Sequence, residues 1–344
     1  MTTALHIIEA LLALSFLVMF HELGHYAVGR LLGFSILEYA IGMGPKLVGF
    51  KKNGIEYNLR ALPLGGMCRF YGEDDGVADE RCFNAQKAWK RFIVILAGPL
   101  MNFVLAFLIA VALPLGWGVA DESQVLVRSV GEGSPAAAGG LLPGDRFLSV
   151  DGKAVAGFEG VTEAVTAADP NHMEVTVLRA GEEKSFVLTN LYNAEADANL
   201  MGVTIAYGTK RVGPLYAIKD GASYCYEMAG LVFKSLGMLF SGQAGLKDMA
   251  GPVGVIQILG QAADSGWYYV LSLCVMLSVN LGIVNLFPIP ALDGGRLLFI
   301  LIEWVRGKPV PPEKEGLVHV IGFALLMILV VVITFNDVLR LIRG

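Results

Sequence analysis

The chain has few cysteines and few charged residues, and both shortages narrow its possible functions. Only 4 of its 344 residues are cysteine, and no two of them show the two-residue spacing of zinc ribbons or dithiol redox motifs. Charged residues make up 17% of the chain, its formal net charge is −5, and no basic stretch is interleaved with aromatic residues. We therefore expect no nucleic-acid partner and draw no function from the cysteines.

Long hydrophobic runs are what the chain does have. Hydrophobic residues make up 55% of it, and a helix of about 20 apolar residues crosses the hydrocarbon core of a bilayer. Four runs are long enough, at 5–20 and onward, 92–117, 268–292 and 317–335. The first run has no Lys or Arg before Arg30 and no small-residue cleavage site, so we expect a retained span rather than a cleaved signal peptide. The sequence predicts a polytopic α-helical protein with four transmembrane helices in the cell (inner or plasma) membrane.

The distribution of basic residues predicts the orientation of these spans, because short cytoplasmic loops carry the excess of Lys and Arg. Basic residues gather between the first two runs: Arg30, Lys46, Lys51, Lys52, Arg60, Arg69, Arg81, Lys87, Lys90 and Arg91. Four more follow the third run: Arg296, Arg306, Lys308 and Lys314. We therefore place both termini and the central region outside the cytoplasm, although Arg340 and Arg343 run against the rule.

Three regions outside the spans have patterns of their own. Residues 36–71 alternate apolar and polar side chains around Gly-rich turns, which predicts membrane-associated β-hairpins. Residues 221–240 are apolar with Glu227 and Lys234 at helical spacing, which favours an amphipathic helix on the bilayer over a fifth span. Residues 121–206 alternate between turns, which predicts a small β-rich domain. Its segments GSPAAAGGLLPGD (133–145) and SVDG (149–152) resemble the PDZ domains of bacterial proteases.

These patterns divide the chain into four parts. Residues 1–120 form the first half of the membrane core, and 121–206 form the PDZ-like domain on the extracytoplasmic side. Residues 207–267 hold the amphipathic helix and a GPVG connector, and 268–344 form the second half of the membrane core.

The sequence HELGH at 21–25 is the strongest chemical signal. Residues four apart lie on one face of a helix, so His21 and His25 can bind one zinc ion, and Glu22 between them can serve as the general base for a water molecule. A chance match is the alternative. Ionisable groups at the end of an apolar helix are costly, however, and mark functional sites by default.

A catalytic zinc ion needs a third protein ligand and one open position. Asp293 is our candidate, because at about 1.5 Å per residue the first and third runs bring HELGH and Asp293 to the same cytoplasmic depth. A helix cap before two glycines is the alternative role for Asp293. Glu303 and His319 are weaker substitutes, whereas His6 and His172 are not expected to be ligands.

Several motifs in order resemble the site-2 protease family of intramembrane zinc metalloproteases, in its bacterial branch that cleaves membrane-bound regulators such as anti-sigma factors. They are HELGH (21–25), AGPLMNF (97–103), the PDZ-like segment, GPVG (251–254) and NLFPIPALDGG (285–295). The resemblance implies a Zn²⁺ cofactor and single-span membrane protein substrates, such as anti-sigma factors or signal-peptide remnants. It also implies a site-1 type protease acting upstream.

The resemblance further suggests which residues bind substrate. Asn285 would contact the substrate backbone or the developing oxyanion, or else tie helices together. Gly42 and Gly44 lie in a stretch, 42–50, that would offer an edge strand to an extended substrate, or else form an ordinary surface hairpin. Asn102 is interpreted as a tie between helices.

Other functions stay open at this point. The PDZ-like domain either excludes substrates with a bulky outer domain or grips a newly exposed C-terminus. It is a single domain where some members of the family carry two. A transporter or channel would use His21, Glu22 and Asp293 as an ion or proton relay, and an adaptor would use the membrane part only as an anchor.

Overall fold

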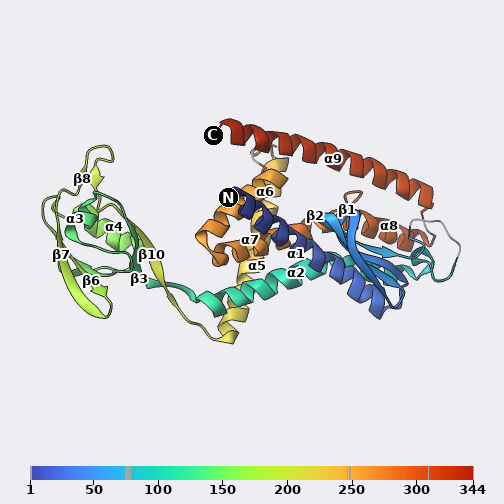
Figure 1. The fold of residues 1–344 in the computed structure, drawn as a ribbon, viewed down its shortest axis with the longest axis horizontal. Helices are drawn as coiled ribbons and strands as arrows, with labels where there is room; N and C mark the ends of the chain where they lie inside the picture. The colour runs from blue at the N-terminus through green and yellow to red at the C-terminus, as the bar shows by residue number, and fades with distance from the viewer. Residues whose placement is uncertain (1, 74–78, 246, 248, 309, 344) are drawn as a thin grey trace. The chain divides into compact units, whose positions relative to one another are not determined.

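The computed structural model describes residues 2–73, 79–245, 247, 249–308 and 310–343. The chain forms two compact units, one made of 1–113 with 215–344 and the other of 114–214. The helices of the first unit are α1 (Thr2–Leu31), α2 (Ala88–Trp117), α5 (Pro214–Phe240), α6 (Pro252–Ser265), α7 (Trp267–Leu286), α8 (Asp293–Arg306) and α9 (Pro312–Arg343) (Figure 1). Its strands are β1 (Ile36–Lys52) and β2 (Ile55–Phe70), and a short 3-10 helix covers Phe83–Ala85.

Four described helices are long and apolar enough to cross a membrane: Leu5–Leu31, Ala88–Trp117, Trp267–Leu286 and Glu313–Ile342. These match the four predicted runs, except that the third run was predicted to continue to residue 292. That end is wrong, because α7 stops at Leu286. Pro288 and Pro290 follow at once, and proline cannot continue a helix and disfavours helical backbone in the residue before it.

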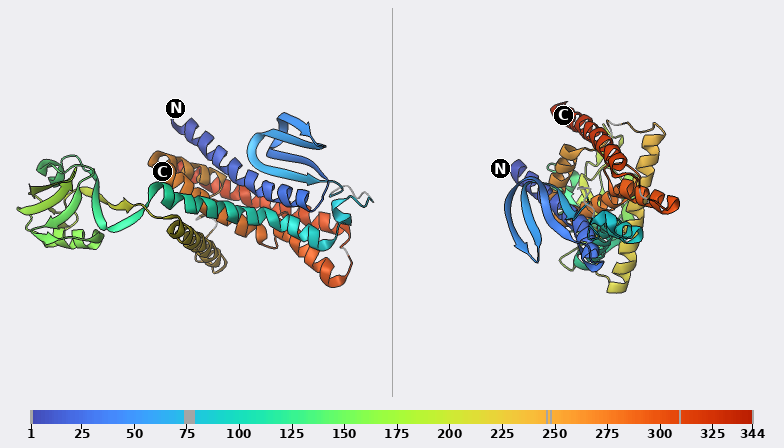
Figure 2. Two further views of the ribbon diagram at one scale, coloured as in Figure 1. Left: turned by 90° about the horizontal axis from the view of Figure 1, so that it is seen from below. Right: turned by 90° about the vertical axis from the view of Figure 1, so that its right-hand side faces the viewer.

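The arrangement inside the first unit separates its two ends. The start of α1 and the end of α9 lie together at one end, whereas the β1–β2 sheet and α8 lie at the other (Figures 1 and 2). The helix α5 contains the predicted amphipathic segment 221–240 and runs across α2 rather than along it. It is not among the four apolar helices, and its place on a bilayer stays a prediction.

The strands β1 and β2 both bend back on themselves, so that 36–41 lies between the two halves of β2. Ile41 pairs with Leu59 on one side and with Gly66 on the other, and Val48 pairs with Leu59 from the outside. The segments therefore lie in the order 46–52, 55–60, 36–41 and 66–70. Gly42 and Gly44, with φ of 85° and 83°, occupy the bend where β1 leaves the middle of the sheet for its outer edge, a conformation that favours glycine.

The GPVG sequence begins a helix instead of serving only as a connector. Gly251 is the N-cap of α6, and the buried Asp337 of α9 accepts a hydrogen bond of 2.8 Å from the Gly254 backbone N–H. A Cβ on Gly251 would lie 2.7 Å from the Asp337 carboxylate. A carboxylate at a helix N-terminus is favoured by the helix dipole, so this contact ties α9 to the start of α6.

The second unit is built around a six-stranded antiparallel sheet. Its elements are β3 (Val119–Val130), α3 (Pro135–Gly139), β4 (Arg146–Val150), β5 (Lys153–Ala154), α4 (Gly157–Ala167), β6 (Met173–Arg179), β7 (Glu182–Leu188), β8 (Tyr192–Asn193), β9 (Ala198–Asn199) and β10 (Val203–Lys210). The strand order is β10-β3-β4-β6-β7, with β5 beside β4. Alternate residues of the strands meet α4 in one apolar core. The unit is β-rich and includes the predicted range 121–206, whereas its PDZ assignment stays a prediction.

An ion pair fixes the GGLLPGD turn of this unit. The carboxylate of Asp145, 1% exposed, accepts hydrogen bonds of 2.6 and 2.7 Å from Arg179 and one of 2.8 Å from the Leu142 backbone N–H. Burial acts to raise the pKa of Asp145, but these donors outweigh it and hold that pKa below its ordinary value. The carboxylate form therefore stabilises the folded unit.

We predict that Asp145→Asn destabilises the second unit by about 3 kcal/mol, because Arg179 would lose the charge that pairs with it. Hydrogen exchange of the β4 and β6 amides in the full-length protein measures this. The stabilisation in the unaltered protein should be complete above about pH 4 and should fall as pH drops through the lower pKa of the folded state. Equal protection in both proteins at pH 7 would contradict the prediction.

Candidate metal centre

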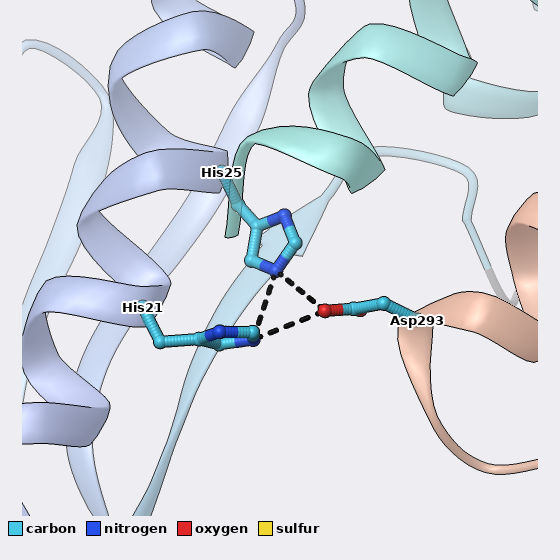
Figure 3. A group of neighbouring side chains, drawn as sticks. All are labelled: His21, His25 and Asp293. Atoms are coloured by element: carbon cyan, nitrogen blue, oxygen red, sulfur yellow. Dashed lines mark hydrogen bonds and ion pairs between the residues drawn. The ribbon is translucent and has the colours of Figure 1, made fainter. Parts of the chain in front are cut away.

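Three side chains from two helices meet at the sheet end of the first unit. His21 and His25 lie on α1, Asp293 is the first residue of α8, and all three point to a common position (Figure 3). The Nε2 atoms of the two histidines are 3.3 Å apart. Asp293 Oδ2 lies 3.1 Å from His21 Nε2 and 3.4 Å from His25 Nε2. The three residues predicted as ligands thus form one group, the only such group of three His, Cys, Asp or Glu found among the described residues.

These separations suit one tetrahedral ion. Zinc binds imidazole nitrogen and carboxylate oxygen at about 2.0–2.2 Å, so neighbouring ligand atoms in a tetrahedral site lie about 3.4 Å apart. The three measured separations are 3.1, 3.3 and 3.4 Å. Asp293 Oδ2 is also buried without a hydrogen-bond partner among the described residues. A cation between the three atoms would satisfy that oxygen, and three protein ligands leave a fourth position open.

The charge state of Asp293 suits a metal ligand. Burial acts to raise its pKa, but the two imidazoles, when they carry a proton on Nε2, outweigh this effect and hold the pKa below the usual carboxyl range. The side chain is therefore a carboxylate, the form that binds zinc.

The ring of His25 is oriented by α2. Its Nδ1 lies 2.9 Å from the backbone carbonyl oxygen of Val94. A carbonyl only accepts hydrogen bonds, so Nδ1 carries the proton and the Nε2 lone pair faces the other two candidate ligands. The contact needs glycine on α2, because a Cβ on Gly98 would lie 2.2 Å from His25 Nε2. A Cβ on Gly24 of α1 would lie 2.2 Å from the Ala97 carbonyl oxygen, so the backbones of α1 and α2 touch here.

Asn102 lies beside the other histidine, one turn further along α2. Its side-chain nitrogen is 3.0 Å from His21 Nδ1, and the residue is fully buried. The sequence interpretation of Asn102 as a tie between helices missed this contact. A polar residue in the interior of an apolar run was the available signal.

Glu22 lies between α1 and the inner edge of the sheet. Its Cγ is 2.6 Å from the position that a Cβ on Gly66 would take. The β2 segment 66–70 therefore holds the side chain predicted as the general base.

The loop between α7 and α8 places Asp293 at the first position of α8. Between α7 and α8 the non-glycine residue Ala291 has φ of 75°, and its N–H donates a hydrogen bond of 2.9 Å to Nδ1 of His319 on α9. A Cβ on Gly294 would lie 2.1 Å from the Phe287 carbonyl oxygen, and one on Gly295 would lie 2.5 Å from that of Ile289. The two glycines allow α8 to start directly against the loop.

The structure gives the alternative candidates other partners. His319 holds the loop through Ala291, and Glu303 accepts a hydrogen bond of 2.5 Å from Arg91. His6 lies 3.0 Å from Asp264, and His172 lies in the second unit. None of these four belongs to the three-residue group. Asn285 lies half-buried in the last turn of α7, and its role, like that of Gly42 and Gly44, stays a prediction.

Comparison with known proteins assigns the chain to a family. The model of peptidase family M50 matches residues 9–329. A relative from Clostridium perfringens is 37% identical over 337 residues, which cover 97% of this chain and 99% of the relative. Zinc metalloprotease RasP of Geobacillus kaustophilus is 33% identical over 411 residues, covering 96% of this chain and 97% of the relative.

A third relative carries a more specific name. Regulator of sigma-W protease RasP of Bacillus subtilis is 32% identical over 406 residues, covering 94% of this chain and 96% of the relative. With four apolar helices and this similarity, the protein is a membrane zinc metalloprotease. The chain belongs to peptidase family M50, the site-2 protease family. The resemblance inferred from its motifs is confirmed, and the transporter and adaptor alternatives are set aside.

The close contact of α1 and α2 generates a prediction about Gly98. Gly98→Ala should reduce zinc content and proteolysis to background, because the added methyl overlaps the His25 ring and forces it away from the other ligands. Metal analysis and a cleavage assay on the detergent-purified protein measure both.

The matched control is Gly116→Ala on the same helix, where an added Cβ would meet no atom within 4 Å. It should keep the zinc content of the unaltered protein. Zinc content that survives in Gly98→Ala would show that His25 does not need this approach.

Proposed function

We propose that this protein is an intramembrane endopeptidase that hydrolyses transmembrane segments of single-span membrane proteins. Zinc would be held by His21, His25 and Asp293, and Glu22 would act as general base. The observation that carries the proposal is the triangle of two imidazole nitrogens and one carboxylate oxygen with sides of 3.1–3.4 Å. Its two histidines lie in the second half of the apolar helix α1, where ionisable groups are costly and mark function.

The residues present suit peptide hydrolysis. When bound, the ion supplies Lewis acidity toward the scissile carbonyl and the attacking water. Glu22 follows His21 directly in the chain, so its carboxylate can accept the proton of that water and return it to the leaving amine. The close approach of Gly66 to Glu22 Cγ places this side chain against the edge of the sheet. Asn285, at the end of α7, can donate a hydrogen bond to the substrate carbonyl or the developing oxyanion without adding charge.

The β1–β2 sheet offers two places for an extended substrate. Gly66 contacts Glu22 and pairs with Ile41 of β1. Gly42 and Gly44 follow soon after Ile41 in the chain, so they lie close to the proposed catalytic carboxylate. Strands in a sheet lie about 4.8 Å apart, which puts the outer segment 46–52 three spacings, or about 14 Å, from 66–70 in a flat sheet. We assign Gly42 and Gly44 to the substrate backbone near the scissile bond.

The outer segment of β1 suits a different part of the substrate. Its apolar side chains Leu47, Val48 and Phe50 are all more than 60% exposed, and the register of β1 leaves one edge of 46–52 without a strand partner among the described strands. An unpaired strand edge recruits extended peptides by main-chain hydrogen bonds. We assign this edge to residues that flank the cleaved segment.

The substrates we propose are membrane-bound regulators, such as anti-sigma factors, or signal-peptide remnants. The name of the Bacillus subtilis relative, regulator of sigma-W protease, supports the first class. We place the protein in the cell membrane with the metal centre near the cytoplasmic side, and with both termini and the second unit outside. The grouping of the start of α1 with the end of α9 supports termini on one side (Figure 2).

We further propose that the second unit excludes substrates whose outer domain has not been trimmed by a site-1 type protease. The alternative is that it grips a C-terminus as an added strand. The edge strand β10 carries Tyr207, whose ring stacks on Phe158 of α4 with centroids 3.8 Å apart. The stack lies on one face of the sheet and leaves the main-chain edge of β10 without a strand partner among the described strands, so deletion of residues 121–206 decides between exclusion and grip.

The role of Glu22 gives a direct test. Glu22→Gln should keep zinc but lower the cleavage rate of a single-span model substrate by about 10²–10⁴-fold, the usual contribution of a general base. His21→Ala and Asp293→Ala should lose both zinc and cleavage. The measurements are metal content and substrate cleavage by the full-length protein in detergent.

The control is Glu9→Gln, which removes a carboxylate from the same helix. At about 1.5 Å per residue, Glu9 lies about 20 Å from Glu22 along α1. It should cleave like the unaltered protein. Undiminished cleavage by Glu22→Gln, or full zinc content in Asp293→Ala, would contradict the proposed site.

Removing residues 121–206 separates exclusion from grip. If the second unit excludes, the shortened protein should cleave a substrate that still carries its outer domain, whereas the full chain cleaves only the trimmed one. A loss of cleavage for both substrates, with zinc retained, would instead show that the unit grips.

A further inference from the structure

The two zinc ligands on α1 differ in what holds their rings. Nδ1 of His25 faces a backbone carbonyl, the Val94 oxygen at 2.9 Å, which fixes the position of its proton. Nδ1 of His21 faces the side-chain amide of Asn102 at 3.0 Å, and an amide can present either a donor or an acceptor.

The chemistry of the site selects one end of that amide. A histidine that binds zinc through Nε2 must keep the Nε2 lone pair free, so its proton lies on Nδ1 and needs an acceptor. Rotation of the Asn102 amide brings Oδ1 to the position beside His21 Nδ1. Oδ1 is a buried atom without a hydrogen-bond partner among the described residues, so no bond within that part of the chain opposes this rotation.

We propose that Asn102 is a positioning residue for His21, whose side-chain carbonyl accepts the Nδ1–H hydrogen bond and keeps Nε2 directed at the metal. This inference rests on the proposed zinc site.

The spacing of the two helices supports the assignment. Gly98 meets His25 and Asn102 meets His21, so contacts four residues apart on α2 match ligands four residues apart on α1. Four residues make about one helical turn, and one face of α2 therefore supports both rings.

Asn102 itself is anchored. Its backbone carbonyl accepts a hydrogen bond of 2.8 Å from Oγ of Ser278 on α7, and both residues are 0% exposed. A side chain with this little freedom can fix a neighbouring ring. The bond between Asn102 and Ser278 uses only the backbone of Asn102, so a tie between α2 and α7 does not explain the amide.

The test compares Asn102→Leu, which removes the acceptor at similar volume, with Asn102→Asp, which offers only acceptors. Zinc affinity of the full-length protein is measured in detergent by competition with a chelator, and the site is also read from the d–d absorption of bound Co²⁺. Asn102→Leu should bind zinc about 10–100-fold more weakly, as is typical when the partner of a ligating histidine is lost. Asn102→Asp should stay within about threefold of the unaltered protein and keep its tetrahedral Co²⁺ spectrum.

Two outcomes overturn the proposal. Unchanged affinity in Asn102→Leu would show that the contact does not matter. An affinity loss in Asn102→Asp as large as that expected for Asn102→Leu would show that His21 needs a hydrogen-bond donor. The aspartate variant therefore tests the proposal even if the leucine variant fails to fold. Thr334→Val, which removes a membrane hydroxyl whose partner is the Val330 carbonyl oxygen, is the control and should keep its zinc affinity.

His21→Ala distinguishes failure of this inference from failure of the site. If His21→Ala keeps zinc, the proposed metal centre is wrong. If His21→Ala loses zinc while Asn102→Leu keeps it, the metal centre stands and only the role of Asn102 is wrong.

Discussion

The proposed metal centre depends on the backbone contact between α1 and α2. At Gly24 and Gly98 any side chain would overlap the neighbouring helix or the His25 ring, with separations of 2.2 Å. Only this close approach brings the Val94 carbonyl and the Asn102 amide within hydrogen-bonding distance of the two imidazoles. Small residues at helix contacts serve this purpose in membranes, where helices gain little from the hydrophobic effect. Without the contact, two polar rings would be left unsatisfied in apolar surroundings.

The carboxylate reaches the same point because the third span stops early. Two prolines end α7, and the loop satisfies its own backbone through short bonds such as Ile289 N–H to the Phe287 oxygen at 2.6 Å and Leu292 N–H to the Ile289 oxygen at 3.2 Å. His319 of α9 supports the strained residue Ala291. Irregular backbone at membrane depth persists where protein satisfies it, and here it places Asp293 at the start of α8.

Paired charges surround this end of the first unit. Arg91 at the start of α2 bonds to Glu303 of α8, Arg296 bonds to Glu73 beyond β2, and Glu38 within the sheet accepts from Arg60 at 2.6 Å and Asn58 at 2.7 Å. Pairs of this kind let charged groups stay close to apolar helices. They connect three elements of the site. The sheet packs against Glu22, α2 contacts the rings of His21 and His25, and α8 begins with Asp293. The excess of basic residues that indicated a cytoplasmic loop is thus partly used in holding the site.

The sequence by itself determined the helical spans, the pair His21 and His25, and the expectation that Asp293 lies beside them, because apolar run length and four-residue spacing follow from local helix geometry. The family followed from motifs whose residues stand in order along the chain. Only the tertiary structure decided that Gly98 and Asn102 face the histidines and that His319 supports the loop through Ala291. Those roles depend on the rotation and approach of helices far apart in the sequence, and hydrophobic periodicity does not encode which face of one helix meets which face of another.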